Sequence, residues 1–339
     1  MKKFVLKHRQ LQSPLSAENI NYKIDYEDRL NQSQFKAVTE TEGPVLVIAG
    51  AGTGKTRTLV YRVARLIESG VTPGEILLLT FTRKAAYEML SRASNLLDER
   101  CSRVEGGTFH FYCSKLLHIY HDAIGYPANF TIIDAADARD TIQFLRSRLD
   151  IQSLKVRFPN KNTLYSIFSS FLNKQTAIEK IVEDEYPQFY QHLELIEKLF
   201  INYKEYKRLN HVMDFDDLLT ETRDLLVNNP DICKKIAAGN RYVMVDEYQD
   251  TNSLQGADHK NILQFPERFK NVKIIRLEKN YRSTQAILDL ANQIIKQASE
   301  KFDKELFTDN ESGELPGIVK ASNNNDQSRF LTQMILNMR

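Results

Sequence analysis

The sequence predicts an α/β fold with a helical region inserted into it. Two apolar runs, Val45–Ala49 and Glu75–Thr80, lack polar alternation and flank a helical pattern. Such runs are typical of strands buried on both faces of a parallel sheet. Strand-like runs then become scarce between about Phe111 and Val212, where helical periodicity dominates, and return at Tyr242–Asp250. A chain of 339 residues has room for two or three such domains.

The first elements form a strand, a helix and a strand. After the run at 45–49, Leu59, Val63, Leu66 and Ile67 recur at the spacing of one helix face. A strand on each side of this helix makes a βαβ unit, which favours an α/β layer architecture. Residues 1–29 precede it, are polar and mixed in charge, and are predicted to be a leader that is loosely ordered or docked over a short stretch.

The helical region and the end of the chain follow the same logic. Ala138–Leu149 has helical periodicity, and Asp134 is placed to cap the N-terminus of that helix. Val272–Leu277 is a further strand candidate, and helical periodicity resumes at Thr284 before fading after Thr308. The predicted division is a first α/β domain of residues 30–110 and 213–272, a helical inserted domain of 111–212, and the beginning of a second α/β domain at 273–339.

Composition excludes several classes of protein. The chain is 42% hydrophobic and 27% charged, which is close to an average globular protein. Its net charge of +2 is too small to indicate a nucleic-acid partner, although local basic clusters remain compatible with it. Three cysteines without metal or redox spacing favour a reducing compartment. Without a signal peptide or an apolar run of membrane length, we expect a cytoplasmic protein with no membrane partner.

A phosphate-binding loop is predicted where the first strand meets its helix. Residues 49–56 read A-G-A-G-T-G-K-T, a P-loop pattern with Ala49 in the place of the first glycine. Gly52 and Gly54 allow the backbone to curl, so that successive N–H groups face an anion at a helix N-terminus. Lys55 would reach the β- and γ-phosphates, and the Thr56 hydroxyl would bind Mg²⁺. The alternative interpretation is a glycine-rich turn with a surface lysine.

A second half of this site is predicted at the strand that begins at Tyr242. This strand delivers Asp246 and Glu247 to its C-terminal end, where open α/β sheets bind ligands. Asp246 would hold Mg²⁺ through its water shell, and Glu247 would act as the general base on the attacking water. An apolar strand that merely ends in two acidic residues is the alternative, which the upstream P-loop disfavours.

The string Asp246–Asn252, DEYQDTN, is more specific and resembles the second motif of the UvrD/Rep/PcrA helicases of superfamily 1. The other similar segments occur in the order of that family: Leu30–Val38, Ala49–Arg57, Thr80–Ala86, Gly107–His110, Asp214–Leu218 and Leu277–Thr284. The resemblance implies RecA-like domains around an ATP site, with an inserted helical domain and the start of a second RecA-like domain. It also implies ATP and Mg²⁺ as cofactors and single-stranded DNA and DNA junctions as partners.

The resemblance assigns roles in nucleotide binding. Gln34 would read the adenine edge, and Tyr281 would pack on the adenine ring. Arg282 would contact the γ-phosphate from the second RecA-like domain, and would be catalytic together with Lys55 and Glu247. The residues expected around the phosphates are Ala51, Gly52, Thr53, Gly54, Lys55, Thr56 and Arg57.

The resemblance also assigns contacts to single-stranded DNA. Arg83 stands where this family usually has asparagine in the first of the two DNA-contact segments. Phe81 and Phe109 could instead be core aromatics, His110 an interior histidine, and Asp214 a helix N-cap. The residues expected to contact DNA are Phe81, Thr82, Lys84, Thr108, Phe109 and His110.

The chain departs from the family pattern at two places. After Asn252 it runs through Gln255 directly into Gly256, without the segment that carries the third motif, its γ-phosphate-sensing glutamine and a base-stacking aromatic. It also stops at Arg339, before the remaining helicase motifs. A covalent chain lacking these parts is expected to couple ATP to DNA poorly and not to unwind duplexes.

Three functional hypotheses follow. The first is a DNA-dependent ATPase and 3′-to-5′ helicase of DNA repair or replication restart, present as a partial chain. The second is a truncated or degenerate module that binds nucleotide or DNA without unwinding. The third is part of a helicase-nuclease of the AddA/RecB type. ATP turnover with and without single-stranded DNA separates the first two hypotheses, and a nuclease domain in the complete gene would identify the third.

Overall fold

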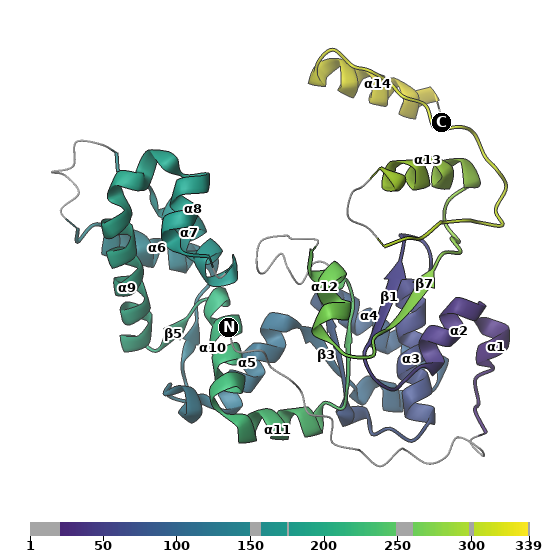
Figure 1. Cartoon of the computed structure of the whole chain (residues 1–339), viewed down its shortest axis with the longest axis horizontal. Helices are drawn as coiled ribbons and strands as arrows, with labels where there is room; N and C mark the ends of the chain where they lie inside the picture. The colour runs from purple at the N-terminus through teal and green to yellow at the C-terminus, as the bar shows by residue number, and fades with distance from the viewer. Residues whose placement is uncertain (1–20, 150–156, 175, 249–259, 298–301, 338–339) are drawn as a thin grey trace. The chain divides into compact units, whose positions relative to one another are not determined.

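The computed structural model describes residues 21–149, 157–174, 176–248, 260–297 and 302–337 (Figure 1). The chain divides into two compact units. The first unit comprises Met1–Val45 and Thr56–Lys273, and the second comprises Leu46–Lys55 and Ile274–Arg339. The junction at Gln255–Gly256, where the third motif is missing, lies outside the described residues.

A parallel three-stranded sheet organises the α/β part of the first unit. Its order is β3 (Glu105–Thr108), β2 (Ile76–Thr80) and β6 (Tyr242–Val245). All five residues of β2 are buried, as expected for a central strand of branched and apolar side chains. In β6, by contrast, Val243 is 54% exposed.

Helices α3 (Lys55–Glu68) and α4 (Arg83–Leu96) supply the core that packs with this sheet. Val63, Leu66 and Ile67 of α3 are each about 1% exposed, which confirms the predicted apolar face. Two short helices, α1 (Tyr26–Arg29) and α2 (Gln32–Thr39), pack on the same unit. Tyr26 is buried, so residues 21–29 include the docked stretch that the sequence left open for the leader.

Helices α6 (Ala135–Arg146), α7 (Lys161–Lys174), α8 (Ile178–Glu185) and α9 (Leu193–Leu209) form a bundle with its own core (Figure 1). Asp134 accepts hydrogen bonds from two backbone N–H groups at the start of α6, which confirms the predicted N-cap. The chain enters and leaves the bundle through β4 (Thr131–Ile132) and β5 (Val212–Met213), which pair in parallel. The bundle is therefore an insertion closed at its base by two short strands.

A second core joins the base of the bundle to helices on either side of it. It contains residues from α5 (Phe109–Ile119) and α10 (Phe215–Asn228), which are followed by α11 (Pro230–Gly239) and, after β6, α12 (Lys260–Arg268). Asp214 is the N-cap of α10, and its side chain and that of Asp217 form a capping box. The alternative of a helix cap for the Asp214 cluster is thus confirmed.

A buried ion network connects α9 to α10. Lys207 is 2% exposed, and its Nζ lies 2.7 Å from Asp214 Oδ2 and 2.6 Å from Asp217 Oδ2. The Tyr203 hydroxyl donates to the same Asp214 oxygen at 2.8 Å. Burial is opposed by the charge of Lys207, which holds the pKa of Asp214 below its usual value. Burial, reinforced by the Asp214 charge, raises the pKa of Asp217 to about 6.

The second unit pairs β1 (Val45–Ala49) with β7 (Lys273–Leu277). Helix α13 (Gln285–Lys296) follows and buries Leu288 and Asn292, whereas α14 (Asn324–Asn337) buries none of its side chains. A single bridge joins Lys279 to Phe307, which brings the segment around Leu306 alongside the chain that leaves β7.

The fold class and the four strands are confirmed, but one detail differs from the sequence prediction. The third predicted strand ends at Val245, so that Asp246 and Glu247 follow its C-terminal end, as predicted. The first two strands, however, do not share a sheet: among the described residues, β1 pairs with β7, and β2 pairs with β3 and β6. Apolar runs identify buried strands but carry no information about their partners, since hydrogen-bond pairing is a property of the backbone.

Candidate functional site

The predicted phosphate loop has the backbone that its glycines allow. Gly52 has φ +81° and Gly54 has φ +86°, values in the left-handed region that other residues rarely adopt. Between them, Thr53 is fully buried, and its Oγ1 donates to the Gly50 carbonyl at 2.9 Å. The loop then opens α3 at Lys55, so that its N–H groups lie at a helix N-terminus.

The surroundings of Lys55 fit an anion. Lys304 is half-buried in the same unit, and burial together with the charge of Lys55 lowers the pKa of Lys304. The charged form of Lys304 would be stabilised if a negative group bound near it. The position is therefore chemically suited to phosphate oxygens, in agreement with the P-loop pattern.

The loop contacts the segment that follows β7. The Asn280 side-chain amide donates to the Ala51 carbonyl at 2.7 Å, and the Tyr281 N–H donates to the Gly52 carbonyl at 2.9 Å. A Cβ at Gly52 would lie 2.7 Å from the Cβ of Arg282. The structure thus places Asn280, Tyr281 and Arg282 directly against the phosphate loop. Tyr281 and Arg282 are themselves exposed.

The second predicted half of the site lies at the end of β6. The Asp246 N–H donates to the Leu79 carbonyl at 2.9 Å, which extends the pairing with β2 by one residue. Glu247 follows with φ 53°, a left-handed conformation that costs a residue with a Cβ roughly 1–2 kcal/mol. Strain of this kind is common at functional positions. Both carboxylates are half-buried.

Mg²⁺ needs few protein ligands, because it keeps several waters and takes others from phosphate. Thr56 lies in the first turn of α3, and Asp246 follows β6. These are the two residues to which the sequence prediction assigns the ion, which would supply positive charge to the phosphates when bound. In the part of the chain that the structure describes, there is no cluster of three or more His, Cys, Asp or Glu side chains with the arrangement of a metal cage.

Both segments expected to contact DNA emerge at one edge of the sheet. The register aligns Thr80 of β2 with Thr108 of β3, and Leu79 with Val245 of β6. The carboxyl ends of three parallel strands therefore bring the two DNA segments and the acidic pair to a common edge. Thr82 and Thr108 accept hydrogen bonds from Ala85 N and Phe111 N, and so cap α4 and α5.

The side chains at this edge differ in exposure. Phe81 is 58% exposed and Lys84 is exposed, so the alternative of a core aromatic is wrong for Phe81. Phe109 and His110 are half-buried, and the His110 ring packs edge-on against Phe215 at 5.6 Å between centroids. Burial lowers the pKa of His110, which favours the neutral form of its ring.

No sequence pattern indicated Phe111. It is 43% exposed, and the Arg83 guanidinium lies 5.5 Å from the centre of its ring. Arg83 is the position where the chain departs from the family pattern, and the cation–π contact gives that departure a partner. Helical periodicity in the sequence could not reveal this pair, because the two residues belong to different helices. Only the register of the sheet brings the first turns of α4 and α5 side by side.

Gln34 and Arg57 are the remaining residues that were expected to contact the nucleotide. Gln34 is 1% exposed, and its Oε1 accepts from Asn31 N in a capping box at the start of α2. Arg57 is exposed, donates to the Arg29 carbonyl at 2.9 Å and lies over the Tyr61 ring. Both side chains therefore have structural contacts at the N-terminal end of the first unit.

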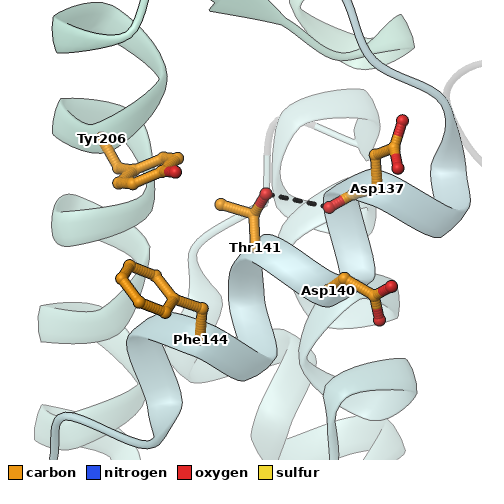
Figure 2. A pocket seen from close by; sticks show the side chains of 5 residues that line it. All are labelled: Asp137, Asp140, Thr141, Phe144 and Tyr206. Atoms are coloured by element: carbon orange, nitrogen blue, oxygen red, sulfur yellow. Dashed lines mark hydrogen bonds between the residues drawn. The ribbon is translucent and has the colours of Figure 1, made fainter.

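A hollow of about 310 Å³ lies elsewhere, on the helical insertion (Figure 2). Thr141 and Phe144 of α6 face Tyr206 of α9 across it, and the Phe144 and Tyr206 rings are 5.9 Å apart. Asp137 and Asp140 also line it. None of the residues that line it belongs to the predicted motifs, so this hollow is not the nucleotide site.

These features define an α/β P-loop protein with an inserted helical bundle. The family of the UvrD/REP helicase N-terminal domain matches residues 30–267, and that of the UvrD-like helicase C-terminal domain matches residues 275–339. The chain belongs to the UvrD/REP helicase family.

Relatives in this family include two staphylococcal proteins. The chain is 34% identical to the ATP-dependent DNA helicase PcrA of Staphylococcus epidermidis over 336 residues, covering 91% of this chain and 45% of the relative. It is 33% identical to PcrA of Staphylococcus aureus over 338 residues, covering 91% of this chain and 46% of the relative. The chain therefore spans about half the length of the curated relatives it matches. No described helix combines the length and the apolarity needed to cross a membrane.

Proposed function

We propose that this chain is the ATP-binding part of a DNA-dependent ATPase and 3′-to-5′ helicase, acting on single-stranded DNA and DNA junctions in repair or replication restart in the cytoplasm. The observation that carries the proposal is the register of β3, β2 and β6. It aligns both expected DNA segments with the acidic pair at one sheet edge. The relatives are ATP-dependent DNA helicases by name, which supports the same activity.

The proposed chemistry assigns each residue one task. Lys55 holds the β- and γ-phosphates, and Thr56 and Asp246 hold Mg²⁺. Glu247 takes a proton from the attacking water. Arg282 stabilises charge on the γ-phosphate, and Tyr281 and Gln34 hold the adenine. The half-buried Glu247 and its turned backbone suit a base whose direction must be set before the reaction.

Contacts to DNA would depend more on stacking between aromatic side chains and bases than on charge. Phe81, Phe109 and His110 would stack on bases without reading sequence, and Thr82, Lys84 and Thr108 would contact the backbone. Because stacking does not read the bases, binding should be insensitive to DNA sequence. Because the backbone contacts involve phosphates, the logarithm of the binding constant should fall linearly with the logarithm of salt concentration. The proposed division is the predicted one, with RecA-like residues 30–110 and 213–272, an insertion at 111–212 and a second RecA-like domain from 273.

A second candidate is a module that binds nucleotide or DNA without unwinding. The specific observation for it is that, among the described residues, β1 and β6 lie in different sheets and Val243 of β6 is 54% exposed. Such a module would bind ATP through Lys55 and would hydrolyse it slowly, with no stimulation by DNA.

ATP turnover with and without a single-stranded oligonucleotide separates the two candidates. We expect Lys55→Ala to weaken ATP binding and Glu247→Gln to retain binding while hydrolysis falls by about 100-fold or more. Glu88→Gln, at an exposed position of α4, is the matched control and should hydrolyse ATP like the wild type. Hydrolysis that does not respond to DNA would favour the second candidate, and unchanged ATP affinity in Lys55→Ala would overturn both.

A further inference from the structure

Asn280 is a buried amide that bonds in two directions at once. It is 2% exposed, and its Nδ2 donates to the Ala51 carbonyl of the phosphate loop at 2.7 Å. Its Oδ1 accepts from the N–H groups of Arg282 and Ser283, both at 2.8 Å. One side chain therefore ties the phosphate loop to the turn that carries Tyr281 and Arg282.

The backbone of Asn280 is held as firmly as its side chain. Its N–H donates to the Phe307 carbonyl at 2.7 Å, and its carbonyl accepts from Thr308 Oγ1 at 2.8 Å. A buried polar group with all these bonds made has one favourable position, since any displacement leaves several of them broken at once. Asn280 therefore cannot follow a movement of the turn without pulling on the loop.

Only an amide can make this pair of contacts at the same length. Aspartate keeps two acceptor oxygens for Arg282 N and Ser283 N but has no donor for the Ala51 carbonyl. Alanine makes neither contact. Asn280→Asp therefore loses the link to the loop and places a negative oxygen against the Ala51 carbonyl, whereas Asn280→Ala loses the links to both segments.

We propose that Asn280 is a positioning residue that sets the phosphate loop and the Tyr281–Ser283 turn in register with each other. This proposal rests on the proposed ATP function. In that function, Arg282 senses the γ-phosphate, while the loop holds the β- and γ-phosphates through Lys55. Asn280 then determines how well the chain distinguishes a triphosphate from a diphosphate, through Arg282, and how well it binds either, through Ala51.

The experiment measures the dissociation constants of a non-hydrolysable ATP analogue and of ADP, each with Mg²⁺, by calorimetry on the full chain. Asn280→Asp should weaken both nucleotides by about tenfold or more, because it loses the donor to the loop and adds a negative charge beside it. Asn280→Ala should weaken both and also reduce the preference for the triphosphate by about tenfold. In an Arg282→Ala background, Asn280→Ala should not reduce this preference further, because the two residues act on one interaction.

Asn292→Ala is the structural control within the same unit. Asn292 is 7% exposed, donates to the Leu306 carbonyl at 2.8 Å and accepts from Leu306 N at 3.0 Å. It should lose thermal stability as Asn280→Ala does and keep the wild-type ratio of the two affinities. An equal loss of triphosphate preference in Asn292→Ala would show that general loosening is the cause, and would overturn the positioning role.

The outcomes also separate this proposal from the proposed function. A wild-type chain that binds neither nucleotide overturns both. A wild-type chain that binds, with Lys55→Ala deficient and folded Asn280 variants unchanged, overturns the role of Asn280 alone. If Asn280→Ala does not fold, Asn280→Asp still decides, since unchanged affinities in that variant contradict a link through Ala51.

Discussion

The helical insertion and the helices of the second unit bury their apolar faces to very different extents. In the insertion, four helices share a core in which Ile142, Leu164 and Leu199 are fully buried. In the second unit, α13 leaves Ile287, Leu290 and Ile294 between 40% and 63% exposed. Helix α14 exposes its entire apolar side, including Leu331 and Ile335.

The difference shows which parts of the chain are stabilised by the described residues. A helix gains most of its stability from packing an apolar face, not from its intrinsic propensity. The insertion contains both sides of its own interface, so its helices stabilise one another. The described residues cover only a fraction of the apolar faces of α13 and α14.

The largest change in stability is expected when the buried ion network of the insertion is disrupted. Lys207→Met leaves Asp214 and Asp217 buried without a counter-charge, which is expected to lower the free energy of unfolding by about 3–5 kcal/mol. Urea denaturation measures this change. Lys204→Met, at an exposed position of the same helix, is the control and should change the free energy by less than about 0.5 kcal/mol. A similar small change in both variants would mean that the network does not hold α9 to α10.

The second test compares one leucine in each region. Leu164→Ala in α7 opens a cavity in a closed core and should destabilise the protein by about 2–4 kcal/mol. Leu331→Ala in α14 removes a side chain that is 51% exposed and should stay within about 0.5 kcal/mol of the wild type. Both follow from denaturant unfolding monitored by circular dichroism. A large loss in Leu331→Ala would contradict the comparison, because it would reveal a packing partner for α14.

The pH dependence of stability tests the same network more finely. The pKa of Asp217 is raised from 3.8 to about 6 on folding, so the folded state favours its protonated form. The contribution of Asp217 to the free energy of unfolding is therefore most favourable below about pH 4 and is lost as pH rises through 6. The free energy of unfolding of the wild type, minus that of Asp217→Asn, should fall by on the order of 2 kcal/mol between pH 4 and pH 7. A rise over that range would reverse the assigned direction.

The smallest expected effect concerns the phosphate loop. Gly52→Ala combines an unfavourable φ of +81° with a Cβ placed 2.7 Å from that of Arg282. Gly43→Ala has φ +78° and meets no atom within 4 Å, so it measures the conformational cost alone, which is about 1 kcal/mol. We expect thermal unfolding to show a further loss of about 1 kcal/mol in Gly52→Ala, with weaker ATP binding only in that variant. Equal behaviour of the two variants would mean that the turn does not press on the loop.

The sequence alone determined the local elements of this protein. Apolar runs located the four predicted strands, and Asp134 and Asp214 cap helices where their side chains and spacing predicted. Gly52 and Gly54 of the phosphate loop adopt the left-handed backbone that their lack of a Cβ permits. These features depend on neighbours within a few residues, so the order of amino acids specifies them directly.

Only the tertiary structure decided which elements meet. The pairing of β1 with β7, the register that sets Thr80 beside Thr108, and the contact of Arg83 with Phe111 join positions that are distant or unrelated in the sequence. The same holds for Asn280, which the sequence presents as one residue of a motif and the structure shows bonded to Ala51, 229 positions away. Such contacts depend on how strands pair and how helices pack. The apolar side chains of a strand indicate that the strand is buried, but they do not indicate which neighbour buries it.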